Sequence, residues 1–353
     1  MSASVLFTNY VALGIDNACA ESAISPQQVF VFTDTNADRL VLPAISSRFL
    51  ANAHKIVMPS GEVNKNLDTL QKVWIELERG GATRSALLIN VGGGVVTDLG
   101  GFAASTFKRG IRFINCPTTL LSAVDASVGG KTGIDFNGLK NEVGVIRDAF
   151  RVIISTKFFS TLPQSEVLSG YAEMLKHALL SSAADFGTLS ALDICHVSPD
   201  EMLSLVESSV KVKQQFVQAD QFETGIRKAL NLGHTVGHAF EDFALQRNSP
   251  VPHGYAVAWG LLAELILSHM ICRFPSKHLY SLAEVINGFY GTFHFTCNDY
   301  DALLQFMRHD KKSLHGEINC TLLTDIAQPT INNAVSPDDM KAALDIFRDM
   351  THC

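Results

Sequence analysis

Two histidines four residues apart are the side chains in this sequence best suited to chemistry. His234 and His238 stand in RKALNLGHTVGHAFE (227–241), where apolar residues recur at helical spacing. In one continuous helix the two imidazoles lie on one face, and Arg227 and Asn231 extend that face. The spacing is typical of zinc-binding helices, but the glutamate of the H-E-x-x-H signature is absent, and histidines packed inside a helix bundle share this spacing. The stretch therefore predicts a metal or polar site and specifies no reaction.

Two more predicted helices carry side chains that could complete a metal site. Glu173 lies in SEVLSGYAEMLKHALLSS (165–182), and His253 opens HGYAVAWGLLAELILSHMI (253–271). Together with His234 they offer one carboxylate and two imidazoles, which leaves the fourth position of a zinc ion open, as in catalytic sites. Because the three residues are far apart in the sequence, their spacing alone cannot establish that they meet.

Glycines and cations in the first half of the chain suit an anionic ligand. Gly92, Gly93 and Gly94 precede a predicted helix, where backbone amides can approach a phosphate, although a tight strand-to-helix turn needs the same glycines. Asp98, one turn into that helix, could bind a hydroxyl group or face solvent. The stretch 109–141 sets polar side chains among glycines, and we expect it to line a cleft with Thr118, Thr119, Asp125, Lys131, Lys140 and Asn141.

The elements that position these residues divide the chain into two parts. Short apolar runs alternate with helical patterns, which predicts a parallel sheet covered on both faces, with strands in 28–34, 54–59, 85–94, 111–119 and 150–155. Ligands of such sheets bind beyond the carboxyl ends of the strands. After about residue 160 only helical patterns remain. We therefore expect an α/β domain at 1–157 and an α-helical domain at 158–353.

Composition excludes several classes of function. Charged residues make up 18% of the 353 residues and the net charge is −7, so we expect neither a nucleic-acid surface nor a membrane-binding patch. No apolar run is expected to be long enough to span a membrane, and the N-terminus does not read as a signal peptide. Seven cysteines without C-x-x-C spacing indicate reduced thiols in a cytoplasmic protein.

Six motifs occur in a fixed order along the chain: GGGVVTDLGGFAASTFKRGI, PTTLLSAVDASVGGKTGID, GLKN, GYAEMLKH, RKALNLGHTVGHAFE and PHGYAVAWG. Together they resemble the 3-dehydroquinate synthase family of the sugar phosphate cyclase superfamily, over about residues 32–312. The resemblance implies a Rossmann-like N-terminal domain with a mostly parallel sheet that binds NAD. It also implies an all-α C-terminal domain that holds a divalent metal ion, Zn²⁺ or alternatively Co²⁺, and a homodimer.

The resemblance assigns a role to individual residues of this chain. The metal ligands it implies are Glu173, His234 and His253, so that His238 becomes a substrate residue and not a ligand. The NAD contacts are Asp34, Asn36, Glu62, Lys65, Gly93, Gly94, Asp98, Thr118, Thr119, Asp125, Lys131, Lys140 and Thr161. The substrate contacts are Arg109, Lys131, Asn141, Lys176, Lys213, Arg227, Asn231 and His238, with Lys131 expected in both sets. A further phosphate contact is expected from Lys311 or Lys312.

The implied substrate is 3-deoxy-D-arabino-heptulosonate 7-phosphate, and the implied products are 3-dehydroquinate and phosphate. NAD oxidises the hydroxyl at carbon 5, phosphate leaves by β-elimination, the hydride returns, and the ring opens and closes again as an aldol. A bound divalent ion acts as the Lewis acid. The substrate carboxylate suits a fixed pair of cations, and the chain offers Lys213 and Arg227.

Three other functions compete with this one. Another sugar phosphate cyclase would act on sedoheptulose 7-phosphate or glucose 6-phosphate, which have no carboxylate for Lys213 and Arg227 to bind. A metal-dependent polyol dehydrogenase of related fold would accumulate NADH. A homologue that only binds nucleotide would lack a metal ligand or Lys131, and the chain has all of them.

Overall fold

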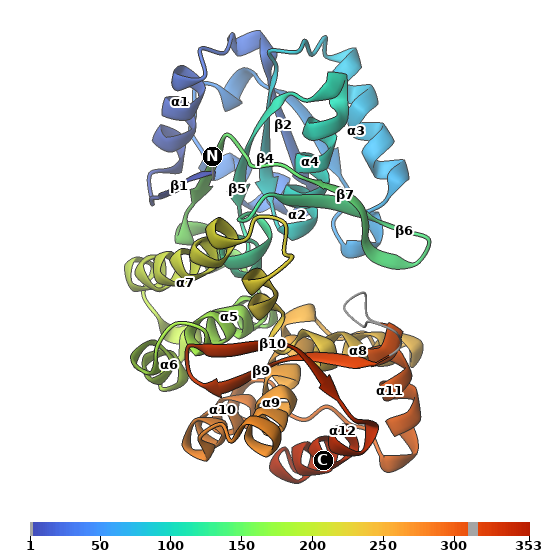
Figure 1. Ribbon diagram of the computed structural model, residues 1–353. Coiled ribbons are helices and arrows are strands. Elements are labelled where there is room, and N and C mark those ends of the chain that lie inside the picture. The colour runs from blue at the N-terminus through green and yellow to red at the C-terminus, as the bar shows by residue number, and fades with distance from the viewer. Residues whose placement is uncertain (1–2, 310–316) are drawn as a thin grey trace. The chain divides into compact units, whose positions relative to one another are not determined.

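The computed structural model describes residues 3–309 and 317–353 (Figure 1). The chain forms two compact units. The first comprises 1–163 together with 197–210, and the second comprises 164–196 together with 211–353. The sequence predicts a single division after residue 157, whereas these units interleave, because a later segment of the chain packs with the first unit.

Six parallel strands form the sheet of the first unit, in the order β1-β8-β5-β4-β2-β3. All residues of β4 are buried, and only one residue at an end of β2 and of β5 is not, which is why these strands read as continuous apolar runs. The predicted α/β fold is confirmed. The strands are β1 (Ser4–Phe7), β2 (Val29–Asp34), β3 (His54–Met58), β4 (Leu87–Gly92), β5 (Arg112–Pro117) and β8 (Arg151–Ile154).

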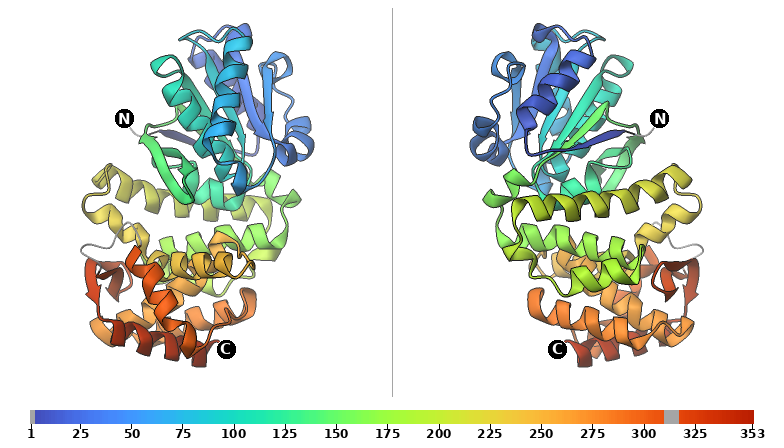
Figure 2. Two further views of the ribbon diagram at one scale, coloured as in Figure 1. Left: turned by 90° about the vertical axis from the view of Figure 1, so that its right-hand side faces the viewer. Right: turned by 90° about the vertical axis from the view of Figure 1, so that its left-hand side faces the viewer.

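Helices cover both faces of this sheet. The two panels of Figure 2 view it from opposite sides, with α1 (Val11–Glu21) in front in one and α3 (Leu67–Arg79) in front in the other. Two further helices, α2 (Thr35–Leu40) and α4 (Gly94–Thr106), follow β2 and β4 directly.

A hairpin that the sequence does not predict packs against α4. It consists of β6 (Lys131–Phe136) and β7 (Leu139–Ile146), paired antiparallel. Every residue of β7 is exposed, so this strand shows no burial pattern from which it could be inferred. The hairpin forms part of the stretch that we expect to line a cleft.

Helices dominate the second unit, as predicted. The residues of α7 are divided between the two units, and α5, α8, α10 and α12 contact a central α9. One antiparallel hairpin of β9 (Ile318–Asp325) and β10 (Gln328–Val335) was not predicted. The helices are α5 (Gln164–Leu179), α6 (Ala183–Ser190), α7 (Pro199–Ala219), α8 (His234–Gln246), α9 (His253–Cys272), α10 (Ser276–Phe289), α11 (Tyr300–His309) and α12 (Pro337–Met350).

The expectation that no segment is long and apolar enough to cross a membrane is wrong for α9. By length and composition this helix passes that test. Most of it is buried within the unit, where it contacts α5, α8, α10, α12 and β9. A helix that is apolar all round is expected at the centre of a helical core, so packing accounts for its composition.

The continuous helix expected over 227–241 is also corrected. A 3₁₀ segment (Ile226–Asn231) ends before Gly233, whose φ of +80° is left-handed, and α8 begins at His234. A β-carbon at Gly233 would lie 2.7 Å from the Leu261 side chain, so this turn requires glycine. Arg227 and Asn231 therefore do not continue the face of α8 that carries the histidines.

Candidate active site

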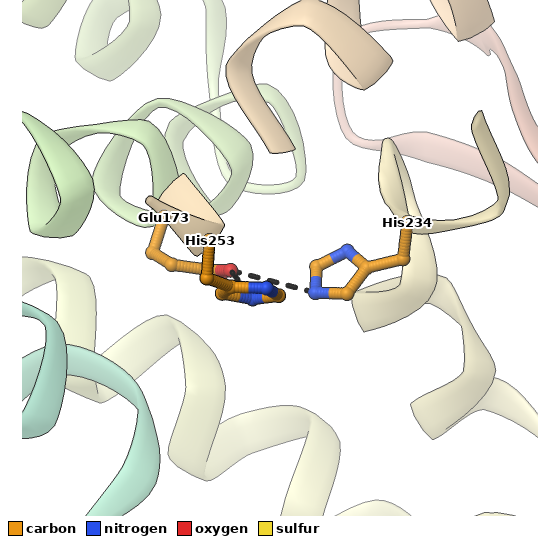
Figure 3. Close-up of side chains that lie close together, drawn as sticks. All are labelled: Glu173, His234 and His253. Carbon is orange, nitrogen blue, oxygen red and sulfur yellow. Dashed lines mark ion pairs between the residues drawn. The ribbon is translucent and has the colours of Figure 1, made fainter. Parts of the chain in front are cut away.

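Three helices of the second unit bring Glu173, His234 and His253 together. Their ligand atoms all lie within 4.8 Å of one another, with Glu173 on α5, His234 as the first residue of α8 and His253 as the first residue of α9 (Figure 3). Oε1 of Glu173 lies 3.4 Å from Nε2 of His234 and 3.9 Å from Nε2 of His253. Ligands bound at about 2.1 Å in a tetrahedral zinc site are about 3.4 Å apart, so the spacing fits such an ion.

Hydrogen bonds at the far side of each ring fix which nitrogen faces Glu173. Nδ1 of His234 lies 3.1 Å from the carbonyl oxygen of Leu232, and Nδ1 of His253 lies 3.2 Å from Oε2 of Glu241. Both partners can only accept, so in the neutral rings the proton is on Nδ1 and the lone pair is on Nε2. Two lone pairs thus face one carboxylate, and a cation between them would turn this repulsion into coordination.

Glu173 is ionised in this setting. Burial by itself would raise the pKa of its carboxyl group, but the positive charge of Lys176, joined by that of His234 whenever its ring is protonated, outweighs burial and holds the pKa well below its ordinary value. Both carboxylate oxygens are buried, and within the described part of the chain neither accepts a hydrogen bond, although Oε2 forms an ion pair with Lys176. The residues present therefore fit a divalent ion.

The substrate residues predicted in the second unit lie at differing distances from this trio. His238 is beside it, with its ring centroid 5.3 Å from that of His234 and 5.9 Å from that of His253. Lys176 is buried against Glu173.

Two of the remaining predicted residues are held by an acidic loop. Nη1 of Arg227, which is only 2% exposed, donates to the carbonyl of Gln221 at 2.6 Å, and its backbone N–H donates to Asp220 at 3.2 Å. Nδ2 of Asn231 donates to Oε1 of Glu223 at 3.0 Å. Lys213 is buried on α7. The loop thus orients Arg227 and Asn231 without help from a ligand.

The NAD contacts predicted in the first unit follow the carboxyl ends of neighbouring strands, where ligands of parallel sheets bind. Asp34 ends β2, and its carboxylate caps α2 by accepting from the amides of Asn36 and Ala37 at 2.8 and 3.1 Å. Each of the other contacts outside the β6–β7 hairpin also follows a strand: Glu62 and Lys65 follow β3, Gly93, Gly94 and Asp98 follow β4, Thr118, Thr119 and Asp125 follow β5, and Thr161 follows β8.

A buried lysine links these NAD contacts to a predicted substrate residue. Nζ of Lys65 lies 2.7 Å from Oδ2 of Asp98 and 2.6 Å from Oδ1 of Asn141 on β7. Burial alone would lower the pKa of Lys65, but Asp98 and Glu62 more than offset it and raise the pKa, so the ammonium stays charged. Lys131 and Lys140 lie on the same hairpin as Asn141.

One predicted substrate residue of the first unit lies at the opposite end of α4 from the predicted NAD contacts. Arg109 follows the C-terminal end of α4, with a left-handed φ of +68°, whereas Gly93 and Gly94 are at the N-terminal end of that helix. The structure does not bring Arg109 to the carboxyl ends of the strands, and its role in substrate binding stays a prediction. Lys311 and Lys312 lie outside the described residues.

Sequence reasoning missed the acidic residues that support the site. Glu241 holds His253, Glu223 holds Asn231, and the buried Glu264 contacts the start of α8. Glu241 stands three residues after His238, and Glu264 is the one charged residue in the apolar sequence of α9. An acidic residue inside an apolar helix was a usable signal, because such a residue is almost never buried without a partner.

The close approach of α8 and α9 should be sensitive to a single methyl group. A β-carbon at Gly260 would lie 2.0 Å from the Gly233 carbonyl oxygen and 2.6 Å from the Gly237 amide nitrogen. We expect Gly260→Ala to lower the free energy of unfolding by about 3 kcal/mol in urea denaturation. Gly288→Ala in α10, where a β-carbon meets nothing within 4 Å, should raise it by about 0.5–1 kcal/mol. Equal effects of both substitutions would contradict the packing argument.

Comparison with known proteins gives matches over most of the chain. The family model for the 3-dehydroquinate synthase N-terminal domain matches residues 55–169, and the model for its C-terminal domain matches residues 170–313. The 3-dehydroquinate synthase of Parabacteroides distasonis is 45% identical over 329 residues, which cover 93% of each chain.

Solved structures share the fold at lower identity. A 2-epi-5-epi-valiolone synthase from Streptomyces hygroscopicus, with NAD⁺ and Zn²⁺ bound, has a TM-score of 0.87 at 23% identity and covers 99% of this chain and 97% of its own. A 2-deoxy-scyllo-inosose synthase, complexed with carbaglucose-6-phosphate, NAD⁺ and Co²⁺, has a TM-score of 0.83 at 22% identity, with 98% and 96% covered. With both family models matched in order and a relative at this level of identity, the chain belongs to the 3-dehydroquinate synthase family.

Proposed function

We propose that this protein is a 3-dehydroquinate synthase, an NAD- and metal-dependent lyase that converts 3-deoxy-D-arabino-heptulosonate 7-phosphate to 3-dehydroquinate and phosphate, a step of aromatic amino acid biosynthesis. Family membership supports the reaction. The observation that carries the site is the buried Glu173 carboxylate faced by the Nε2 lone pairs of His234 and His253. A homodimer and a cytoplasmic location remain predictions.

When bound, NAD supplies a reversible hydride acceptor, and a divalent ion, Zn²⁺ or Co²⁺, supplies a Lewis acid at the substrate oxygens. Glu173, His234 and His253 would hold the ion. The strand ends of the first unit would hold NAD. Two structural neighbours bind NAD⁺ with Zn²⁺ or with Co²⁺, which supports the pair of cofactors.

The residues of this chain would bind the two charged ends of the substrate. Lys213 and Arg227 are buried cations that suit the substrate carboxylate through charge-assisted hydrogen bonds. Asn231 and His238 would also contact the substrate. Lys131 and Asn141 on the β6–β7 hairpin suit the phosphate, which can take up the proton removed during its own elimination. Binding of the charge at both ends would restrict the orientation of the sugar and so select the hydroxyl group that is oxidised.

The choice of substrate tests this proposal against other sugar phosphate cyclases. We expect kcat/KM for the heptulosonate 7-phosphate to exceed that for sedoheptulose 7-phosphate by at least ~100-fold, because the second sugar leaves Lys213 and Arg227 without a carboxylate. Phosphate release from each sugar, at one NAD concentration, gives the comparison. A preference for sedoheptulose 7-phosphate would assign the chain to another cyclase activity.

Removal of the metal should abolish the reaction. We expect chelator-treated protein to release no phosphate and to recover activity with Zn²⁺ or Co²⁺, while it stays folded by circular dichroism. Mg²⁺ should not restore activity, since two imidazole ligands favour zinc and related ions. Full activity in thoroughly metal-free protein would contradict the proposed Lewis-acid site.

A further inference from the structure

Glu264 is a fully buried carboxylate that the proposed reaction does not use. It lies on α9, three turns after His253, and no part of its side chain is exposed to solvent. Its oxygens accept hydrogen bonds from the first turn of α8: Oε2 from the Gly233 amide at 2.7 Å and Oε1 from the Val236 amide at 3.1 Å. Because a buried carboxylate is costly to desolvate, it is retained only where hydrogen bonds compensate for the lost water, and these two amides provide such bonds.

The two amides are those that a helix normally satisfies with its own side chains. Gly233 is the N-cap of α8 and Val236 is its third residue. In a capping box, the N-cap side chain accepts from the third amide and the third side chain accepts from the N-cap amide. The side chains of Gly233 and Val236 contain no hydrogen-bond acceptor. Glu264 accepts from both amides instead, from the neighbouring helix α9. Its negative charge also faces the positive end of the α8 dipole.

The residue between these two anchored amides is a proposed metal ligand. His234 follows Gly233 directly, and its Nδ1 donates to the carbonyl of Leu232, the residue before Gly233. The backbone that sets both the position and the ring orientation of His234 is thus the backbone held by Glu264. Because α9 also begins with His253, one helix carries one ligand and anchors the other.

We propose that Glu264 is a positioning residue of the metal centre, which fixes His234 against Glu173 and His253 by capping α8 from α9. This inference rests on the metal site proposed above. It predicts that loss of the carboxylate weakens metal binding even in folded protein, because the His234 imidazole is then no longer held at coordination distance.

Cobalt binding to metal-free protein tests the proposal without reference to activity. We expect Glu264→Gln, which keeps one acceptor oxygen, to weaken Co²⁺ binding about tenfold, and Glu264→Leu to weaken it about 100-fold. The visible absorption of bound Co²⁺ should change in band position and intensity, because the geometry of one imidazole ligand changes. Glu264→Gln is nearly isosteric and gives the result if Glu264→Leu does not fold.

Ser268→Ala is the matched control on the same helix. Oγ of this buried serine accepts the Leu323 amide of β9 at 3.0 Å and donates to the backbone carbonyl of Glu264 at 2.6 Å, so the substitution costs two hydrogen bonds to the backbone, neither of which involves α8 or the Glu264 carboxylate. We expect it to lower the free energy of unfolding and leave Co²⁺ affinity and spectrum unchanged. Wild-type Co²⁺ binding in both Glu264 variants, or equal weakening by Ser268→Ala, would overturn the inference. Failure of the wild-type protein itself to bind Co²⁺ would instead contradict the proposed metal site.

Discussion

Glu173→Gln should lower kcat/KM by at least ~10³-fold and release the bound metal. The substitution keeps the shape of the side chain but removes the anionic ligand, and the Lewis-acid contribution that depends on it amounts to several kcal/mol. It also removes the carboxylate that forms an ion pair with the ammonium group of Lys176, a residue that is only 1% exposed. We therefore expect the free energy of unfolding to fall by about 3 kcal/mol as well.

The two consequences can be separated by experiment. Metal content by mass spectrometry and kcat/KM are measured on protein shown to be folded, with Glu166→Gln as control, because that residue lies on the same helix and is exposed. The control should keep its metal and its activity. If Glu173→Gln lost activity and retained the metal, Glu173 would be a partner of Lys176 and not a ligand.

Arg227→Ala should raise KM for the heptulosonate about 100-fold and leave the Kd of NAD unchanged. The guanidinium is buried and already oriented by Gln221, so its hydrogen bonds to a carboxylate need little ordering. Arg227→Lys should recover part of the loss, because it keeps the charge and loses the planar fork.

Lys228→Ala controls for the loss of one positive charge next to this residue. Its Nζ lies 3.5 Å from Oδ1 of Asn332, and we expect the substitution to change KM less than threefold. Isothermal titration with NAD and steady-state kinetics with the sugar give the two measurements. Equal losses of NAD and substrate affinity in Arg227→Ala would contradict a role in binding the carboxylate.

The parallel sheet could be predicted from the sequence because its strands are buried on both faces. The runs that contain β2, β4 and β5 are nearly continuous apolar segments, and helices follow two of them directly. The β6–β7 hairpin could not be predicted, because an exposed strand carries no alternation of apolar and polar residues. The sequence identified polar residues of the hairpin as candidates for a site, but it did not indicate that they lie on strands.

The site shows a second limit of pattern reasoning. Apolar spacing continues across Gly233, so the sequence reads as one helix, although the left-handed glycine divides it. That break is set by Leu261 and Gly260 on another helix, which no local pattern reveals. For the same reason spacing selects His238 as the partner of His234, whereas the three-dimensional cluster takes His253 instead.

The stoichiometry of phosphate and NADH tests the central claim most directly. The protein is mixed with excess heptulosonate 7-phosphate and a small amount of NAD, and both phosphate release and NADH absorbance are followed through many turnovers. We predict many phosphates released per NAD, with no net accumulation of NADH, because each hydride is returned within the same turnover. NADH that grows in step with turnover, or no phosphate at all, would contradict the account and indicate a dehydrogenase or a protein that only binds nucleotide.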